Sequence, residues 1–519
     1  MTIPRRSFVA RAIPAVLALI LAAAPTALAD WTHAAPEEHG MDSANLESMK
    51  NLIDETDLPI DSVVILRGGE IVFEYFPRLP LYGPDIPHNL YSTTKSITST
   101  LIGIAIEMGF IEDVHQQVID FFPDREIQNL DDRKRRMTLE HLLTMTSGLE
   151  WEGPDDIHHS WGDGLRSGDP VQYALDRPMA YEPGEVWYYN GGCSHVLSAI
   201  LTEATGMSTL TFARRYLFGP LGITLVVWPS DPNGIYYGGQ DIHLSPYAMA
   251  KIGQLFLDGG LWEGEQIVPA EWVEASRTSH AATWMGGYGY QWWTYPDSGI
   301  YYASGAFEQR IYIAPELDMV VVFTSSNQAP GIGQGERAVG PPVVEWLLSR
   351  FILPACDGFE QLAYDAYGVS LSIPHLLDGW TSGGPGVAHA SEDAGLVLFS
   401  YAGSPYERLG IRWTTPNGTC DPAAALNDLH ECLSVLGTQI EEVDPPAKIA
   451  TAAGPATYQR MTMVQDHGPE IAYFGTRSCD ESGLSVVVYL GVAERFIPWI
   501  DPLEELTRIL ESLECSGGE

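Results

Sequence analysis

The chain has 519 residues, with 68 aspartates and glutamates against 28 lysines and arginines, a formal net charge of −40. An acidic surface of this kind repels nucleic acids and anionic membranes, and no cluster of basic residues opposes it, so we expect neither as a partner. The length exceeds what one hydrophobic core usually holds and predicts two or three domains.

Residues 1–29 have the pattern of a secretory signal peptide. Three arginines lead into an apolar run at 12–24, and Ala27-Leu28-Ala29 provides a small-residue cleavage site. The run is too short for a membrane span, which needs ~20 apolar residues. The Arg5-Arg6 pair also suits a twin-arginine signal, so both export routes stay open. We expect an exported protein, periplasmic or secreted.

The first elements after the signal are a helix, two strands and a longer helix. Apolar residues at helical spacing predict a helix at 41–56. Strands follow at 62–67 and 70–75, joined by a glycine pair that favours a hairpin. The next helix is predicted at 92–108, and its apolar side predicts a central position in the fold.

The middle of the chain predicts more helices and then strands. A glycine-, aspartate- and tryptophan-rich loop is expected at 147–169, and a loop of that length is uncommon unless it is functional. Strands at both ends with helices between them predict one sheet built from distant parts of the chain, in a layered α+β or α/β domain. We choose α+β, over residues 36–352. The predicted helices are 138–145, 196–205, 210–217, 245–258 and 342–351, and the predicted strands are 289–295, 300–304, 309–314 and 319–325.

Composition changes near residue 360, and residues 363–519 predict a second, smaller α+β domain. It carries no catalytic pattern. Its alternation of strands and helices, with Gly379-Trp380 and a closing helix, resembles the α+β accessory domains of photosystem-P-like proteins. The resemblance implies interaction or stabilisation, with a protein or cell-wall component as its possible partner. Its predicted strands are 369–373, 394–401, 471–475 and 484–490, and its predicted helices are 423–436 and 503–513.

Five of the six cysteines lie beyond residue 350. An exported protein can keep disulfides. Cys420–Cys432 is the expected pair because it closes a short loop, while Cys356, Cys479 and Cys515 could supply a second bridge in a connectivity that stays open. Cys193, isolated in the first domain, is predicted to be a buried thiol.

The first sign of chemistry is Ser92-Thr93-Thr94-Lys95 at the start of the predicted central helix. A serine three residues before a lysine places both side chains on one face of the first turn. A serine hydroxyl is a weak nucleophile until a neighbouring base takes its proton. The lysine must be uncharged to do so, which burial in an apolar helix favours. Ser92 and Lys95 are therefore candidates for a nucleophile and its base, and the case depends on the motifs that surround them.

Several later motifs follow in a fixed order, and together they resemble the serine β-lactamase-related hydrolases. This group includes class C β-lactamases, penicillin-binding D-alanyl peptidases, esterases and 6-aminohexanoate-dimer hydrolases. The resemblance covers about residues 36–350. It implies a β-lactamase/transpeptidase-like fold, with an antiparallel sheet flanked by helices and a helical region. The motifs are Ser92-Thr-Thr-Lys95, Leu142-Leu-Thr-Met-Thr-Ser-Gly148, Pro183-Gly-Glu-Val-Trp-Tyr-Tyr-Asn-Gly-Gly192, Phe218-Gly-Pro-Leu-Gly222 and Gly289-Tyr-Gln-Trp-Trp293.

The resemblance assigns roles to particular residues. Ser92 would accept the acyl group, Lys95 would act as general base, and Tyr189 would relay protons. The backbone N–H groups of Ser92 and Ala306 would form the oxyanion hole that holds the tetrahedral intermediate. The residues expected to contact substrate are Asn190, Ser304, Gly305 and Trp161. Neither a cofactor nor a metal is predicted.

Two departures from the family pattern bear on the substrate. Ala303 replaces the cationic residue that meets a substrate carboxylate in β-lactamases and D-alanyl peptidases. Gly191 stands where the family's asparagine is expected, although Asn190 is adjacent. Both weaken recognition of β-lactams and peptidoglycan ends and leave the acyl-transfer residues in place.

The sequence therefore predicts an exported serine hydrolase that forms an acyl-enzyme on Ser92, acting on a small-molecule ester or small amide. A D-amino-acid peptidase, with a short peptide-like substrate, is the second candidate and a β-lactamase the last. A third alternative is a protein that keeps the fold and binds a cell-wall component or partner without turnover. A further alternative is a two-part enzyme whose C-terminal domain covers the cleft.

Overall fold

The structure is a computed structural model. It describes residues 31–56, 58–151, 159–283, 286–296, 298–326 and 343–356, together with the backbone of strands between residues 362 and 515.

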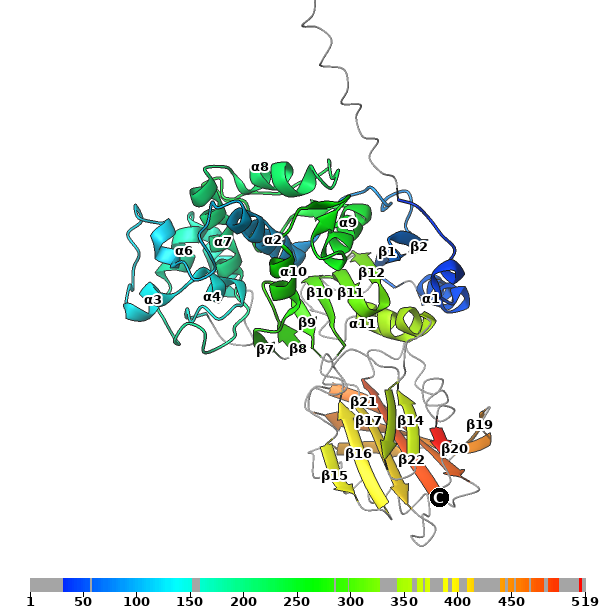
Figure 1. Ribbon diagram of the computed structural model, residues 1–519. Coiled ribbons are helices and arrows are strands. Elements are labelled where there is room, and N and C mark those ends of the chain that lie inside the picture. The colour runs from blue at the N-terminus through cyan, green and yellow to red at the C-terminus, as the bar shows by residue number, and fades with distance from the viewer. Residues whose placement is uncertain are drawn as a thin grey trace, which may run out of the picture.

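An eight-stranded antiparallel sheet forms the centre of the N-terminal part, in the order β2-β1-β12-β11-β10-β9-β8-β7 (Figure 1). The two strands nearest the start of the chain therefore join the last strand of this region, with Ile65 opposite Val321. This confirms the prediction of one sheet built from both ends. The strands are β1 (Ile60–Arg67), β2 (Glu70–Tyr75), β7 (Ala281–Thr283), β8 (Gly286–Tyr288), β9 (Trp293–Tyr295), β10 (Ile300–Gly305), β11 (Gln309–Ala314) and β12 (Met319–Ser325).

The middle of the sheet is covered on both faces. Every residue of β11 and β12 is buried, which fits their nearly continuous apolar sequences. Helix α9 (Pro246–Leu257) packs against β1, β11 and β12. Helix α1 (Ser43–Thr56) packs against the turn that continues α11 (Val343–Leu347), and in Figure 1 α9 and α11 lie on opposite sides of these strands.

Several of the remaining helices, α2, α4, α5, α6 and α8, pack around α7 (Gly191–Thr205) beside the sheet. Residues 191–201 of α7 are all buried, and α2 (Thr94–Glu107), which starts just after Ser92, packs along it. Among the described residues no single helix is long and apolar enough to cross a membrane, and α7 meets that test only jointly with the segment 209–218, bent by 74°. The other helices are α3 (Asp132–Arg136), α4 (Leu139–Leu143), α5 (His159–Arg166), α6 (Pro170–Asp176), α8 (Thr209–Ala213) and α10 (Ala270–Arg277).

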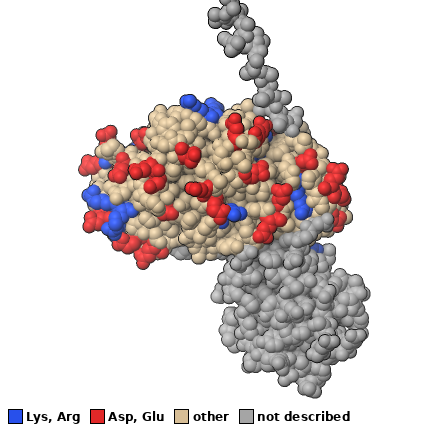
Figure 2. Space-filling view, in the orientation of Figure 1, with Lys and Arg blue, Asp and Glu red and all other residues tan. Residues whose placement is uncertain are grey.

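The acidic side chains are dispersed over the surface. On the face shown in Figure 2, aspartates and glutamates are scattered over the whole described part, with a few lysines and arginines between them. No single acidic patch dominates that face, as expected for a solvated acidic surface.

Of the predicted strand at 289–295, only the last three residues form a strand, β9 (Trp293–Tyr295). The chain turns between β8 and β9, with Gln291 in a left-handed conformation (φ 63°). The side chains of Ser96 and Ser99 on α2 donate to the carbonyls of Gln291 and Tyr290, both at 2.7 Å. These bonds hold the turn against α2, so it cannot continue as a strand.

Two other boundaries differ from the prediction. The predicted loop 147–169 contains α5, and residues 152–158 lie outside the described part. Helix α7 begins at Gly191 rather than at 196, because Asn190 caps it by accepting from the backbone N–H groups of Gly192 and Cys193. Asparagine favours the N-cap position. The two glycines that follow it disfavour a helix, so the sequence did not predict a start there.

Beyond residue 362 the described backbone consists of strands in two antiparallel sheets. The smaller sheet has the order β13-β14-β23, and the larger has the order β15-β16-β17-β22-β21-β20-β18, with β19 paired to β20. The predicted helices 423–436 and 503–513 lie outside the described residues apart from Leu513, which begins a strand, so a separate α+β domain at 363–519 stays a prediction. The strands are β13 (Leu362–Ala366), β14 (Val369–Ile373), β15 (Gly386–Ala390), β16 (Ala394–Ser400), β17 (Arg408–Thr414), β18 (Gln439–Val443), β19 (Ala447–Thr451), β20 (Gly454–Gln465), β21 (Gly468–Cys479), β22 (Leu484–Ala493) and β23 (Leu513–Cys515).

The described cysteine side chains are thiols. Cys193 is fully buried on α7, as predicted, and burial raises the pKa of its thiol to about 12. Cys356, a candidate for a second bridge, is a buried thiol whose Sγ lies 3.5 Å from the Ile352 carbonyl and 3.8 Å from Met319 Sδ. The predicted Cys420–Cys432 pair lies outside the described residues.

Changing Gly253 to alanine should lower the stability of the fold. A Cβ at this position of α9 would lie 2.4 Å from Val320 Cγ1 on β12 and 3.0 Å from Ile311 Cγ2 on β11. Overpacking of this kind costs about 1–3 kcal/mol, more than the ~1 kcal/mol that alanine gains over glycine inside a helix. We expect a lower melting temperature, recovered in part by adding Val320→Ala. An unchanged or higher melting temperature for Gly253→Ala would show that α9 does not approach the sheet this closely.

Candidate active site

Ser92 and Lys95 meet at the junction of two kinds of helical turn. A 3-10 turn, η2 (Tyr91–Thr93), leads directly into α2. In this arrangement Lys95 Nζ lies 3.1 Å from Ser92 Oγ. Ser92 is half-buried and Lys95 is 4% exposed. The nucleophile is therefore open to solvent on one side, while the amine beside it is withdrawn from water.

The amine of Lys95 has a second fixed partner that the sequence reasoning missed. Nζ donates to the carbonyl oxygen of Gly239 at 2.7 Å. A neutral amine can use one N–H for this bond and turn its lone pair toward the Ser92 hydroxyl. After it takes a proton, the resulting ammonium keeps the carbonyl as an acceptor. This geometry suits a general base.

Tyr189 covers the lysine with the face of its ring. Lys95 Nζ lies 4.8 Å from the ring centroid, a distance at which the ring attracts an ammonium more than an amine. The ring is stacked on Trp293 (centroids 5.7 Å apart) and has Trp187 and Tyr288 at 6.3 and 6.4 Å. This aromatic group holds Tyr189 directly before the cap of α7. Its role as a proton relay stays a prediction.

The end of β10 reaches the nucleophile because Gly305 has no side chain. A Cβ on Gly305 would lie 2.1 Å from the Leu90 carbonyl oxygen and 3.0 Å from Thr93 Oγ1. Ala306 follows it, exposed, in the turn to β11. The strand end and the serine turn are therefore in direct contact, as an oxyanion hole built from the N–H groups of Ser92 and Ala306 requires.

Side chains of β11 hold this turn from inside the sheet. Arg310 donates to the carbonyl oxygens of Gly305 (2.8 Å) and Gln309 (3.1 Å), and its Nε lies 3.3 Å from Glu345 Oε1 on α11. Gln309 donates to the carbonyl oxygens of Phe307 and Ser325. Together these bonds join the turn to its own strand, to the neighbouring β12 and to the closing helix.

Two aromatic side chains flank the serine, and the sequence reasoning missed them. Tyr91 precedes Ser92, and Phe307 follows Ala306. Their ring centroids lie 5.0 Å apart, Phe307 is 45% exposed, and both residues have left-handed backbones (φ 46° and 57°). Such conformations are costly for large side chains and gather at functional sites. Burial and the nearby Asp241 raise the pKa of the Tyr91 phenol.

The residues expected to contact substrate fall in different places. Asn190 is 1% exposed, and its side chain is engaged in capping α7, so we assign it to positioning that helix. Ser304 is half-buried on β10 beside Gly305, opposite Arg310, and Ala303 is fully buried. Trp161 lies in α5, and its side chain is outside the described part of the chain.

The loop that supplies the Gly239 carbonyl lies tightly along α7. A Cβ on Gly238 would lie 2.0 Å from the Ser194 carbonyl oxygen, and one on Gly239 would lie 3.2 Å from that of Gly191 and 3.5 Å from Lys95 Nζ. Only glycine fits at Gly238 without moving the loop. The only signal in the sequence is the glycine pair after two tyrosines. No neighbouring residue indicates that the Gly239 carbonyl would bind Lys95.

The chain is similar to known proteins. The Beta-lactamase family model matches residues 45–339. The 6-aminohexanoate-dimer hydrolase of Paenarthrobacter ureafaciens is 25% identical over 312 residues, which cover 56% of this chain and 77% of that protein. The monacolin J acid methylbutanoyltransferase of Aspergillus terreus is 28% identical over 163 residues, covering 28% of this chain and 39% of that protein.

Among solved structures, simvastatin synthase from Aspergillus terreus aligns with a TM-score of 0.43 and 17% identity, over 55% of this chain and 92% of that one. The family match, which spans more than half of the chain, confirms the β-lactamase/transpeptidase-like fold that the ordered motifs predict. The chain belongs to the beta-lactamase family of serine hydrolases.

Proposed function

We propose that this protein hydrolyses a carboxylic ester or a small amide through an acyl-enzyme on Ser92. The observation that carries the proposal is the 3.1 Å contact between Ser92 Oγ and the buried amine of Lys95, which the Gly239 carbonyl holds in place. A serine and a base within hydrogen-bond reach, with the base itself oriented by a third group, form an activated nucleophile.

The proposed reaction has two halves. In the first, Lys95 takes the Ser92 proton while Oγ bonds to the substrate carbonyl carbon, and the N–H groups of Ser92 and Ala306 bind the oxygen that becomes negative. The bond to the leaving group then breaks, and the proton passes from Lys95 to that group, with the Tyr189 phenol as relay. In the second half, water loses a proton to Lys95, attacks the acyl carbon and releases the acid, and Ser92 regains its proton.

The surroundings of the serine favour an uncharged acyl group. Ala303 offers no positive charge to a substrate carboxylate, and the rings of Tyr91 and Phe307 offer an apolar surface. This argues against a D-amino-acid peptidase, whose substrate ends in a carboxylate. The relatives include proteins named as a 6-aminohexanoate-dimer hydrolase, a methylbutanoyltransferase and a lovastatin esterase, and these names are consistent with an ester or a small amide.

The setting of the enzyme belongs to the same proposal. Residues 1–29 have a signal-peptide pattern, so we place the mature enzyme in the periplasm or outside the cell. A disulfide between Cys420 and Cys432 would be compatible with that location. Residues 363–519 would supply an accessory region that binds a protein or cell-wall component.

Ser92→Ala should abolish labelling by a fluorophosphonate probe and lower kcat on a nitrophenyl ester at least about 1,000-fold, because the nucleophile is removed. Ser48→Ala, an exposed serine on α1, serves as the matched control and should label normally. Labelling that persists in Ser92→Ala would place the nucleophile elsewhere.

Lys95→Ala and Lys95→Arg should both lower kcat by roughly 100- to 10,000-fold, the usual range for loss of a general base. The arginine variant keeps a positive charge but does not give up its proton, so it separates the role of a base from that of a charge. Lys50→Ala on α1 is the control. Near-normal turnover by Lys95→Arg would contradict the assignment of Lys95 as the base.

Phe307→Ala should reduce kcat/KM more for esters of phenylacetic or hexanoic acid than for an acetate ester. Removing an apolar ring from a partly exposed site weakens binding of an apolar acyl chain by about 1 kcal/mol, or roughly fivefold. Phe307→Leu keeps an apolar side chain and should retain most of the preference. An equal loss on all three esters would show that Phe307 shapes the turn and does not touch the acyl chain.

A further inference from the structure

A buried aspartate–histidine pair lies outside the catalytic contacts described above. His195 Nε2 on α7 lies 3.2 Å from Asp231 Oδ2, and both side chains are fully buried. The other carboxylate oxygen of Asp231 accepts from the backbone N–H groups of Asn233 (2.8 Å) and Ile235 (2.9 Å). Asp231 therefore closes a tight turn and ties it to the middle of α7.

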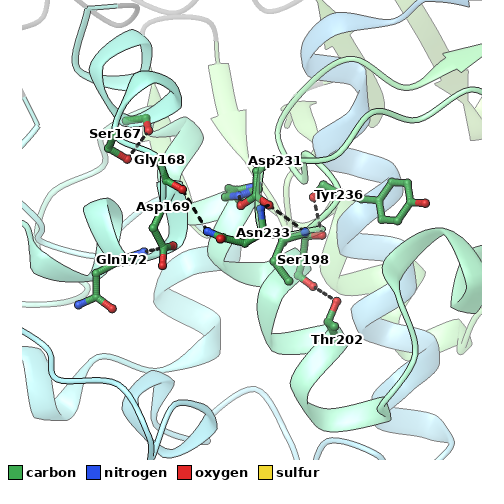
Figure 3. A network of polar contacts seen from close by, with 12 residues as sticks. Ser167, Gly168, Asp169, Gln172, Ser198, Thr202, Asp231, Asn233 and Tyr236 are labelled. Atoms are coloured by element: carbon green, nitrogen blue, oxygen red, sulfur yellow. Dashed lines mark hydrogen bonds and ion pairs between the residues drawn. The ribbon is translucent and has the colours of Figure 1, made fainter.

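This turn leads straight into the segment that holds the catalytic lysine. Four successive carbonyls, at residues 236–239, each accept from a different side chain. The donors are Ser198 to Tyr236 (2.7 Å), Trp228 to Tyr237 (2.9 Å), Thr98 to Gly238 (2.8 Å) and Lys95 to Gly239 (2.7 Å). Figure 3 shows Ser198 on α7 between Thr202 and Tyr236, with Asp231 and Asn233 beside it.

The segment has no room to settle in another register. The Gly238 position lies against the Ser194 backbone, one residue before His195. If the chain shifted so that Tyr237 took the Gly238 position, a tyrosine side chain would stand where only glycine fits. If it shifted the other way, Gln240 would take the Gly239 position, where a Cβ would lie 3.2 Å from the Gly191 carbonyl oxygen. Either shift would also turn the carbonyl that now accepts from Lys95 away from the amine.

A buried charge pair is weak evidence for stability, and it can act by fixing one arrangement of the turn. Burying a hydrogen-bonded charge costs desolvation, and an apolar pair of similar size is often as stable. The hydrogen bonds from His195 and the two backbone N–H groups outweigh that desolvation, so the pKa of Asp231 lies below its usual value and the carboxylate is ionised at neutral pH. An ionised carboxylate accepting three N–H bonds permits one arrangement of the turn.

We propose that Asp231 and His195 are positioning residues for the general base, because they fix the loop that presents the Gly239 carbonyl to Lys95. The inference rests on the proposed function, in which Lys95 acts as that base. In this proposal neither residue contacts substrate. Both act only by positioning the Gly239 carbonyl that accepts from Lys95. They should therefore control kcat and leave KM nearly unaffected.

The test measures kcat and KM on a nitrophenyl ester for variants of the full chain, with melting temperatures in parallel. Asp231→Ala should lower kcat about 10- to 100-fold with KM within twofold. Asp231→Asn keeps the acceptor for both backbone N–H groups and should retain at least a third of the activity. His195→Leu leaves that turn intact, so its kcat should fall between those of Asp231→Ala and Asp231→Asn. His195→Gln restores an N–H donor and should recover part of the kcat that His195→Leu loses.

Asn233 provides the matched control. It lies in the same turn, but its side chain donates outward to the Gly168 carbonyl at 3.2 Å (Figure 3). Asn233→Ala should change kcat less than threefold even if it lowers the melting temperature. If Asn233→Ala lost as much kcat as Asp231→Ala, any substitution in this turn would impair catalysis, and the positioning role would be refuted.

A double variant separates positioning from general destabilisation. If Asp231 acts through Lys95, Asp231→Ala should cause no further loss of the residual activity of Lys95→Ala. A further tenfold loss would overturn the proposal. If Asp231→Ala does not fold, His195→Leu is measured in the same background and is judged by the same outcomes. The proposed function fails separately, if Ser92→Ala keeps its activity.

Discussion

The site depends on one short contact between a serine hydroxyl and an amine that is kept from water. Lys95 Nζ can approach Ser92 Oγ to 3.1 Å because both lie on the same side of a helix start. The amine stays in place because Gly239 accepts from it and the ring of Tyr189 covers it. A lysine at the same spacing on an exposed helix would have neither contact, and its amine would not be held beside the serine.

Three elements supply that environment. Helix α2 carries the serine and lysine, and α7 is the surface against which the Gly238–Gly239 segment packs. The end of β10 adds the candidate oxyanion donor by contacting the serine turn at Gly305. In each case the close approach depends on a glycine at the point of contact. A few close contacts between backbone segments therefore set the geometry of the site.

The parts predictable from the sequence are those with a local signature. The Ser92–Lys95 spacing, the apolar strands of the central sheet and the ordered motifs each depend on nearby residues, and they predicted the fold and the approach of Lys95 to Ser92. The Gly239 acceptor and the Tyr91–Phe307 pair join segments that are over 140 residues apart in the chain. No local pattern can reveal such contacts. The break at Gln291 was missed for the same reason, since distant serine side chains on α2 hold it. The start of α7 was missed although its signal, Asn190 before two glycines, is local.

The most direct measurement is intact-protein mass spectrometry of the enzyme quenched during turnover of a nitrophenyl ester. An acyl-enzyme on Ser92 predicts a burst of nitrophenol close to one equivalent, a mass increase equal to one acyl group, and its location on the peptide that contains Ser92. Turnover with an acyl group on another residue, or turnover of the ester with no acyl adduct at any quench time and no burst, would contradict it.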